Sequence, residues 1–178
     1  MTPHQVASPD AAKIAMAADI LRTRRPIRLR ATGTSMLPAL WPGDLLTIEP
    51  LDATKATVGD IVLAARDGRF VVHRLAQIGG QHGAADWITR GDAMPEYDSP
   101  VSAENILGRV SQVERNHREF IVPRQLPAAG RAFAALIAHS DFLRNAVLRM
   151  IALRQKLSAP PAATPRPPHS SAAPLFEK

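Results

Sequence analysis

Short β-type runs dominate the sequence between Pro26 and Val122. The runs are rich in Ile, Val, Leu and Phe and cover residues 27–29, 45–48, 60–64, 70–75, 87–89, 106–113 and 120–122. Turn signals separate them, notably Pro42-Gly43-Asp44, Asp67-Gly68, Gly79-Gly80 and Arg90-Gly91-Asp92. Strands joined by such short connections favour antiparallel pairing. The pattern therefore predicts a mostly β protein with a compact antiparallel β domain.

Helical segments are expected on both sides of this domain. Residues 1–25 form an arm with a short helix over about 10–22, and residues 26–126 form the β-rich domain. Residues 127–157 form an amphipathic helical segment, with apolar residues on one side and Arg131, Arg149 and Lys156 on the other. The Pro- and Ala-rich residues 158–178 are expected to be a disordered tail.

The basic charge is concentrated at the two ends of the chain. The formal net charge is +6, but residues 32–121 carry twelve acidic and eight basic side chains. A nucleic-acid-binding domain would place Lys and Arg on its folded core, so no nucleic-acid partner is expected. Basic ends fit either an anionic surface or simple solubility. Peripheral membrane contact through residues 128–156 is thus one alternative, and packing of this helix on the β domain or on a second copy is favoured slightly.

The chain contains no cysteine, which excludes a disulfide scaffold, thiol catalysis and zinc sites with Cys ligands. His82, His117 and His139 follow no ligand pattern, so no metal or other cofactor is expected. There is no secretory signal pattern, and no apolar run approaches the roughly 20 residues that span a bilayer. The cytoplasm is the default location, with peripheral membrane contact left open. The oligomeric state is undetermined.

Three places carry side chains suited to chemistry. Ser35 lies between a glycine and a proline-containing turn, where its hydroxyl is reachable and nearby backbone N–H groups are free to stabilise an oxyanion. His73 lies on the expected return strand of a hairpin that turns at Asp67-Gly68. Asp92 and Asp98 lie in a turn-rich loop. Each feature alone has an ordinary structural explanation, since serines and aspartates are common in turns and a lone strand histidine is usually structural.

In this order the three places resemble the superfamily of signal peptidases and SOS-repressor autoproteases, which are serine peptidases on a β-rich fold. The resemblance covers about residues 32–113, roughly half of the chain. The matching boxes are Gly33-Thr34-Ser35-Met36-Leu37-Pro38, Gly43-Asp44, Gly59-Asp60-Ile61-Val62, His73-Arg74, Gly91-Asp92, Asp98 and Gly108-Arg109-Val110.

The resemblance implies a catalytic role for four residues. Ser35 is the expected nucleophile and His73 the general base. Typical bacterial signal peptidases use a lysine base, so His73 resembles the branch found in the endoplasmic reticulum, archaea and some bacteria. Asp98 is the favoured partner that orients His73, with Asp92 as a structural or supporting carboxylate.

The resemblance also implies an oxyanion site and a substrate pocket formed by Gly33, Thr34, Met36 and Pro38. Many signal peptidases have a serine at the position of Gly33, so Thr32, Thr34 or backbone alone would have to serve the oxyanion here.

Three candidate functions are compatible with this sequence. The favoured one is a signal-peptidase-like serine endopeptidase that cleaves a leader or exported peptide after a small residue. The second is an SOS-type regulatory autoprotease, although the segment before the nucleophile box is short for a DNA-binding module and a histidine base argues against it. The third is a non-catalytic relative that binds peptides by strand addition. The expected partner is a peptide or protein precursor substrate.

Overall fold

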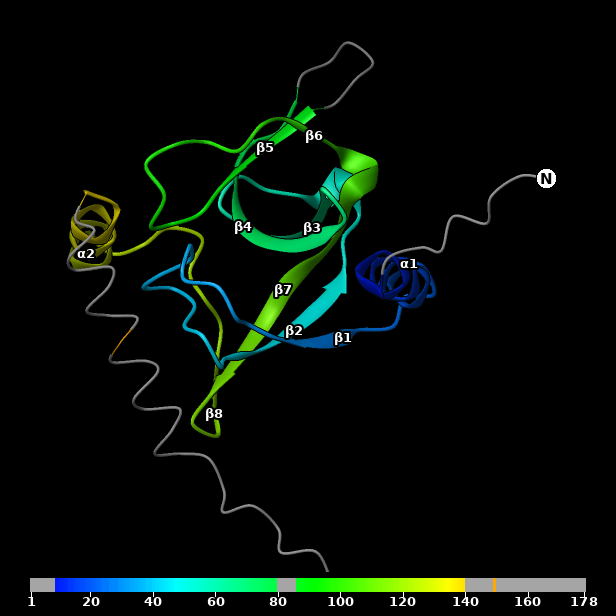
Figure 1. The fold of residues 1–178 in the computed structure, drawn as a ribbon, viewed down its shortest axis with the longest axis horizontal. Coiled ribbons are helices and arrows are strands. Elements are labelled where there is room, and N and C mark those ends of the chain that lie inside the picture. The colour runs from blue at the N-terminus through cyan, green and yellow to red at the C-terminus, as the bar shows by residue number, and fades with distance from the viewer. Residues whose placement is uncertain (1–8, 80–85, 140–148, 150–178) are drawn as a thin grey trace, which may run out of the picture.

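The computed structural model describes residues 9–79, 86–139 and 149 and consists of an antiparallel β sheet with one helix on each side (Figure 1). The strands follow the order β1-β2-β7-β3-β4-β5-β6, and β8 pairs with β7. The elements are α1 (Pro9–Arg22), β1 (Ile27–Arg30), β2 (Leu45–Pro50), β3 (Ile61–Arg66), β4 (Arg69–Gln77), β5 (Asp86–Arg90), β6 (Val101–Ser102), β7 (Ile106–Arg115), β8 (Arg118–Phe120) and α2 (Ala128–His139), with short 3-10 turns at Ala53–Lys55 and Ala103–Asn105.

The predicted mostly antiparallel β fold is confirmed. The turn expected at Asp67-Gly68 joins β3 to β4, and both residues have positive φ angles, 49° and 70°, as a tight two-residue hairpin requires. The last strand begins two residues earlier than the sequence indicated. Asn116 and His117 form a second turn of this kind, with φ of 52° and 61°, so pairing restarts at Arg118. Strand β6, only two residues long, was not predicted.

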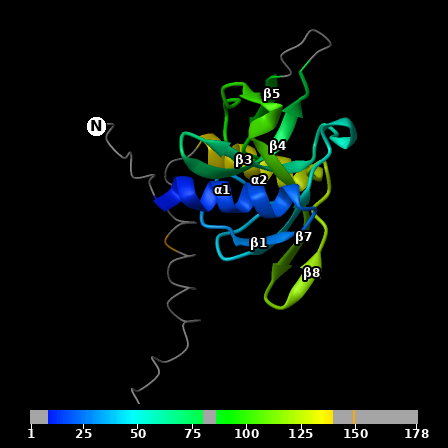
Figure 2. The same ribbon diagram turned by 90° about the vertical axis from the view of Figure 1, so that its right-hand side faces the viewer.

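The two helices cover opposite sides of the β domain, as the two views show (Figures 1 and 2). Helix α1 buries Ala17, Ala18 and Leu21, and α2 buries Ala134 and Ile137. The part of the predicted segment 127–157 that α2 represents therefore packs on the domain. The predicted tail, 158–178, lies outside the described residues. Within the described part of the chain, neither helix is long and apolar enough to cross a membrane.

Strand β3 contributes to two of the hydrophobic core clusters and holds β4 in place. Its first four residues are all buried. Ile61 and Leu63 point into a cluster with Leu21 of α1, whereas Val62 and Ala64 point into a cluster with Leu75, Trp87 and Ile106. Because side chains alternate across a strand, one short run serves both clusters. This burial fixes the register of β4, the strand that carries His73.

Two Gly-Asp pairs build matching turns before β2 and β3. Gly43 and Gly59 adopt φ angles of 97° and 98°, a region that only glycine enters readily. The following aspartates, Asp44 and Asp60, each accept a hydrogen bond from the backbone N–H three residues earlier, at 2.7 and 3.0 Å. The Gly-Asp sequence is thus explained by turn geometry at these two positions.

Candidate active site

Ser35, His73 and Asp98 form a continuous hydrogen-bonded chain. They come from the segment between β1 and β2, from β4, and from the segment between β5 and β6. The Ser35 hydroxyl lies 2.9 Å from His73 Nε2, and His73 Nδ1 lies 2.6 Å from Asp98 Oδ2. In the tautomer with its proton on Nδ1, His73 donates to Asp98 and accepts from Ser35. This arrangement prepares a serine hydroxyl for attack on a carbonyl carbon.

A second donor, Thr89 of β5, holds the Asp98 carboxylate. The Thr89 hydroxyl donates to Asp98 Oδ2 at 2.6 Å, and the Asp98 N–H donates to the Thr89 carbonyl at 2.9 Å. Thr89 is buried, and the sequence analysis missed its role. A strand was expected there, and its alternation places Thr89 on the same face as the buried Trp87. That pattern does not reveal which carboxylate the hydroxyl meets.

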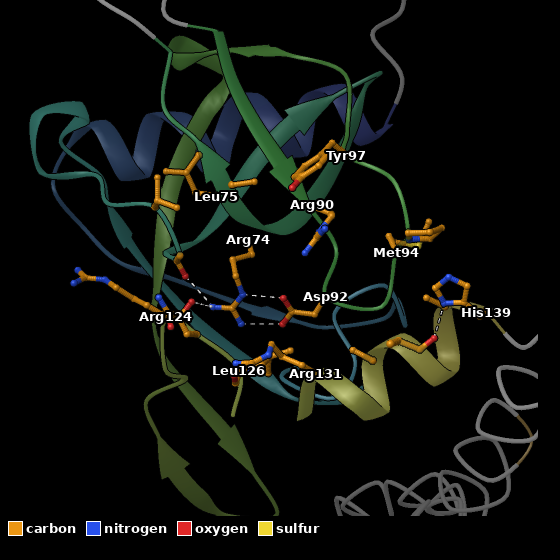
Figure 3. Close-up of a pocket in the computed structure, with 18 residues that line it drawn as sticks. Arg74, Leu75, Arg90, Asp92, Met94, Tyr97, Arg124, Leu126, Arg131 and His139 are labelled. Carbon is orange, nitrogen blue, oxygen red and sulfur yellow. Dashed lines mark hydrogen bonds and ion pairs between the residues drawn. The ribbon is translucent and has the colours of Figure 1, made fainter. Parts of the chain in front are cut away.

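Asp92 contacts Arg74 and not His73. Arg74 donates from Nε and Nη2 to the two carboxylate oxygens of Asp92, each at 2.8 Å (Figure 3). The sequence had left open which aspartate orients His73, and in the structure Asp98 has this contact. The remaining Arg74 nitrogen, Nη1, donates to three backbone carbonyls, those of Gly59, Pro123 and Arg124.

Gly91 allows the nucleophile segment to lie against the loop that follows β5. The Ala93 N–H donates to the Ser35 carbonyl at 2.8 Å. A Cβ on Gly91 would lie 2.7 Å from that carbonyl oxygen and 2.7 Å from Met94 Cγ. Any larger residue would therefore push Ser35 or Met94 away. The requirement comes from close approach, since Gly91 does not have the positive φ of the other two Gly-Asp turns.

A cavity of about 450 Å³ lies beside Ser35 and His73, between two strand edges. Strand β1 pairs only with β2, and β4 pairs with β5 only from Arg74 onward, so each strand has a free edge among the described strands. A free edge presents unpaired N–H and C=O groups. Both strands line the cavity, which is bordered by Leu29, Arg30, Ala31, Thr32, Gly33, Ser35, Met36, Leu40, Leu46, Arg69, Phe70, Val71, Val72 and His73.

The residues expected to form the oxyanion site and substrate pocket occupy different places. Gly33 and Met36 line the 450 Å³ cavity, and Met36 is also buried in the core. Thr34 lines a smaller cavity of about 280 Å³ on the α2 side of Ser35. Pro38 lines neither of these two cavities, and its carbonyl accepts a hydrogen bond from the Trp41 indole at 2.9 Å.

Across residues 9–79 and 86–139, no group of three or more His, Asp or Glu side chains is arranged to hold a metal ion.

Comparison with protein-family models matches residues 2–110 to the family described as Peptidase S24-like. The matched range contains Ser35, His73 and Asp98 as well as strands β1 to β6. It covers more than half of the chain and ends before β7 does. A search of curated proteins found no match.

Proposed function

Because the chain belongs to the Peptidase S24-like family, we propose that it is a serine endopeptidase of signal-peptidase type. Its substrate in this proposal is a leader or exported peptide, cleaved after a small residue. The observation that carries the proposal is the hydrogen-bonded chain from Ser35 through His73 to Asp98. His73 as the general base supports assignment to the signal-peptidase branch that uses histidine instead of lysine.

The proposed reaction is acyl transfer to Ser35. His73 Nε2 accepts the hydroxyl proton as Ser35 Oγ bonds to the peptide carbonyl carbon, and the carbonyl oxygen becomes an oxyanion. His73 then gives the proton to the leaving amine, and the acyl-enzyme remains. His73 next takes a proton from water as the water oxygen bonds to the ester carbon. It then returns that proton to Ser35 Oγ as the ester C–O bond breaks and the carboxylic acid product leaves. Asp98 keeps the proton of the imidazole on Nδ1 and stabilises the charged ring.

The two free strand edges support binding of the substrate in extended form. A peptide added between β1 and β4 would satisfy backbone groups on both edges, as in strand addition. Alternate side chains would then enter the cavity, whose wall includes Leu29, Met36, Phe70 and Val72. Ser35 and His73 lie on the same cavity, which brings the peptide carbonyl to the nucleophile.

The proposal is tested by a cleavage screen read by mass spectrometry. Wild-type protein and the Ser35→Ala and His73→Ala variants are incubated with a diverse peptide library at pH 7–8, with detergent micelles present. We expect each variant to lower kcat by about 10⁴-fold or more, because the members of such a triad act as a unit. The matched control is Ser102→Ala, because Ser102 is exposed and its side chain makes no capping hydrogen bond.

If neither wild type nor Ser35→Ala cleaves any peptide in the library, the endopeptidase proposal is contradicted. Family membership also supports a regulatory autoprotease, and the same samples test it. In that case wild type would cleave itself, which lowers its measured mass, whereas Ser35→Ala would keep its full mass. The added peptides would not be cleaved. Binding of library peptides without any cleavage would favour the peptide-binding relative.

A further inference from the structure

A cavity of about 520 Å³ lies between β4, β5 and α2 (Figure 3). Its wall contains four arginines but a single carboxylate, that of Asp92. The arginines are Arg74, Arg90, Arg124 and Arg131. The rest of the wall is largely apolar and includes Leu75, Met94, Tyr97, Leu126 and Ala134. A concave site with this excess of positive charge fits a ligand that carries negative charge.

Two of the four arginines have no carboxylate partner among the described residues. Asp92 neutralises Arg74, and Arg124 donates to Asp60 at 2.7 Å. The Arg90 guanidinium instead lies 4.9 Å from the centre of the Tyr97 ring. Arg131 donates one hydrogen bond to the Leu126 carbonyl at 3.1 Å. Arg90 and Arg131 therefore keep N–H groups that can bind an anion.

The Arg74–Asp92 pair leaves no carboxylate in the described wall of the arginine cavity for Arg90. Arg74 and Arg90 are directly paired residues of β4 and β5, so their side chains lie on the same face of the sheet. The one carboxylate nearby, Asp92, is engaged by both of its oxygens with Arg74.

The arginine cavity lies next to a cavity that the nucleophile lines. It shares Met94, Pro95 and Ala138 with the 280 Å³ cavity that Ser35 and Thr34 line. The two cavities therefore border each other beside α2. A peptide held with its scissile bond at Ser35 would approach the arginine cavity on this side.

We propose that the arginine cavity binds an acidic side chain of the substrate peptide, with Arg90 and Arg131 as the carboxylate ligands. The inference rests on the proposed peptidase function and adds a substrate class, peptides with Asp or Glu on the α2 side of the cut. Pairing of guanidinium with carboxylate is the strongest class of hydrogen bond available here. The position of this cavity beside the one that Ser35 lines favours a peptide over an anionic lipid head group.

The test measures peptide binding to Ser35→Ala protein, which keeps the cavities but lacks the nucleophile. The probes are fluorescent Ala-rich decapeptides with one Glu, moved through each position, and matched peptides with Gln. We expect the Glu peptide to bind about tenfold more tightly at one favoured position. Arg90→Gln combined with Arg131→Gln should abolish this difference. Arg118→Gln is the matched control, because Arg118 is exposed on β8 and lines neither cavity.

Equal affinity of the Ser35→Ala protein for all Glu and Gln pairs would overturn the inference, and this comparison needs no arginine variant to fold. An unchanged Glu preference in the double arginine variant would overturn it as well. Arginine-dependent binding to phosphatidylglycerol vesicles, with no Glu preference among peptides, would assign the cavity to lipid instead.

Peptidase activity separates the two proposals. If wild type cuts Glu and Gln peptides with the same KM, the peptidase function stands and the acidic substrate class fails. If wild type cuts nothing but Ser35→Ala prefers Glu peptides, the cavity stands and the peptidase function fails.

Discussion

Asp98 shares one carboxylate oxygen between two donors, the His73 imidazole and the Thr89 hydroxyl, each at 2.6 Å. A carboxylate held this way cannot rotate freely, so the imidazole that it contacts is also held. The Asp98 backbone N–H is bonded to the same threonine, which ties the loop to β5. Thr89 therefore acts as a positioning residue, because it reaches the reacting atoms only through Asp98 and His73.

Replacing Thr89 with valine tests this role. The substitution keeps the side-chain shape and removes the hydroxyl, so we expect kcat to fall about tenfold with little change in KM. Thr89→Ser keeps the hydroxyl and should restore most of kcat. The measurement is steady-state cleavage of a peptide identified in the library screen. A purely structural threonine would instead give equal kcat for the valine variant and wild type.

At the scale of elements, α2 is connected to the nucleophile segment through packing. Ile137 and Ala134 are buried, and Ile137 packs with Leu37 and Ala93. Leu37 lies two residues after Ser35, and the Ala93 N–H donates to the Ser35 carbonyl. The helix thus packs against both segments that hold the Ser35 backbone, the one that follows Ser35 and the one that bonds to its carbonyl. The other face of α2 is partly apolar too, because Leu136 is 52% exposed.

Two alanine substitutions on this helix should separate packing from exposure. Ile137→Ala should lower the free energy of unfolding by about 2–4 kcal/mol, because it removes buried methyl groups and leaves a cavity. Leu136→Ala should change it by less than about 1 kcal/mol. Chemical denaturation followed by circular dichroism measures both. Equal effects of the two substitutions would contradict the packing of α2 on the domain.

For the whole molecule, two buried aspartates connect distant parts of the chain. Asp44 is 2% exposed and accepts from Arg115 at 2.8 and 2.6 Å, which joins the start of β2 to the end of β7. Asp60 is 5% exposed and accepts from Arg124 at 2.7 Å, which joins the turn before β3 to the segment before α2. Since each carboxylate has hydrogen-bonded partners, its burial is compensated.

The buried Asp44 should contribute more to stability than an exposed aspartate. Asp44→Asn should lower the free energy of unfolding by about 2 kcal/mol, because the buried carboxylate that accepts from Arg115 and from the Trp41 N–H is lost. Asp19→Asn is the matched control, since the side chains of Asp19 and Arg22 are more than 70% exposed, and it should cost less than about 1 kcal/mol. Thermal and urea unfolding measure the two. A smaller loss for Asp44→Asn than for Asp19→Asn would contradict this account.

Local patterns in the sequence were sufficient for the β fold and for its hairpin at Asp67-Gly68. Alternation and turn chemistry act over a few residues, so they can be recognised without the tertiary structure. The same kind of information predicted the end of α1 at Arg22. It failed at β8, because the turn residues Asn116 and His117 are less typical than Asn-Gly or Asp-Gly.

The sequence by itself determined the mostly antiparallel β fold, and the order of its motifs identified Ser35, His73, Asp92 and Asp98 as candidates. Only the tertiary structure decided that Asp98 contacts His73 while Asp92 contacts Arg74. It also decided that Thr89 holds Asp98 and that four arginines line one cavity. Strand alternation and turn sequences depend on neighbouring residues, so they can be recognised in the sequence. These contacts instead join side chains that are far apart in the chain. Their geometry exists only after the strands have paired in register.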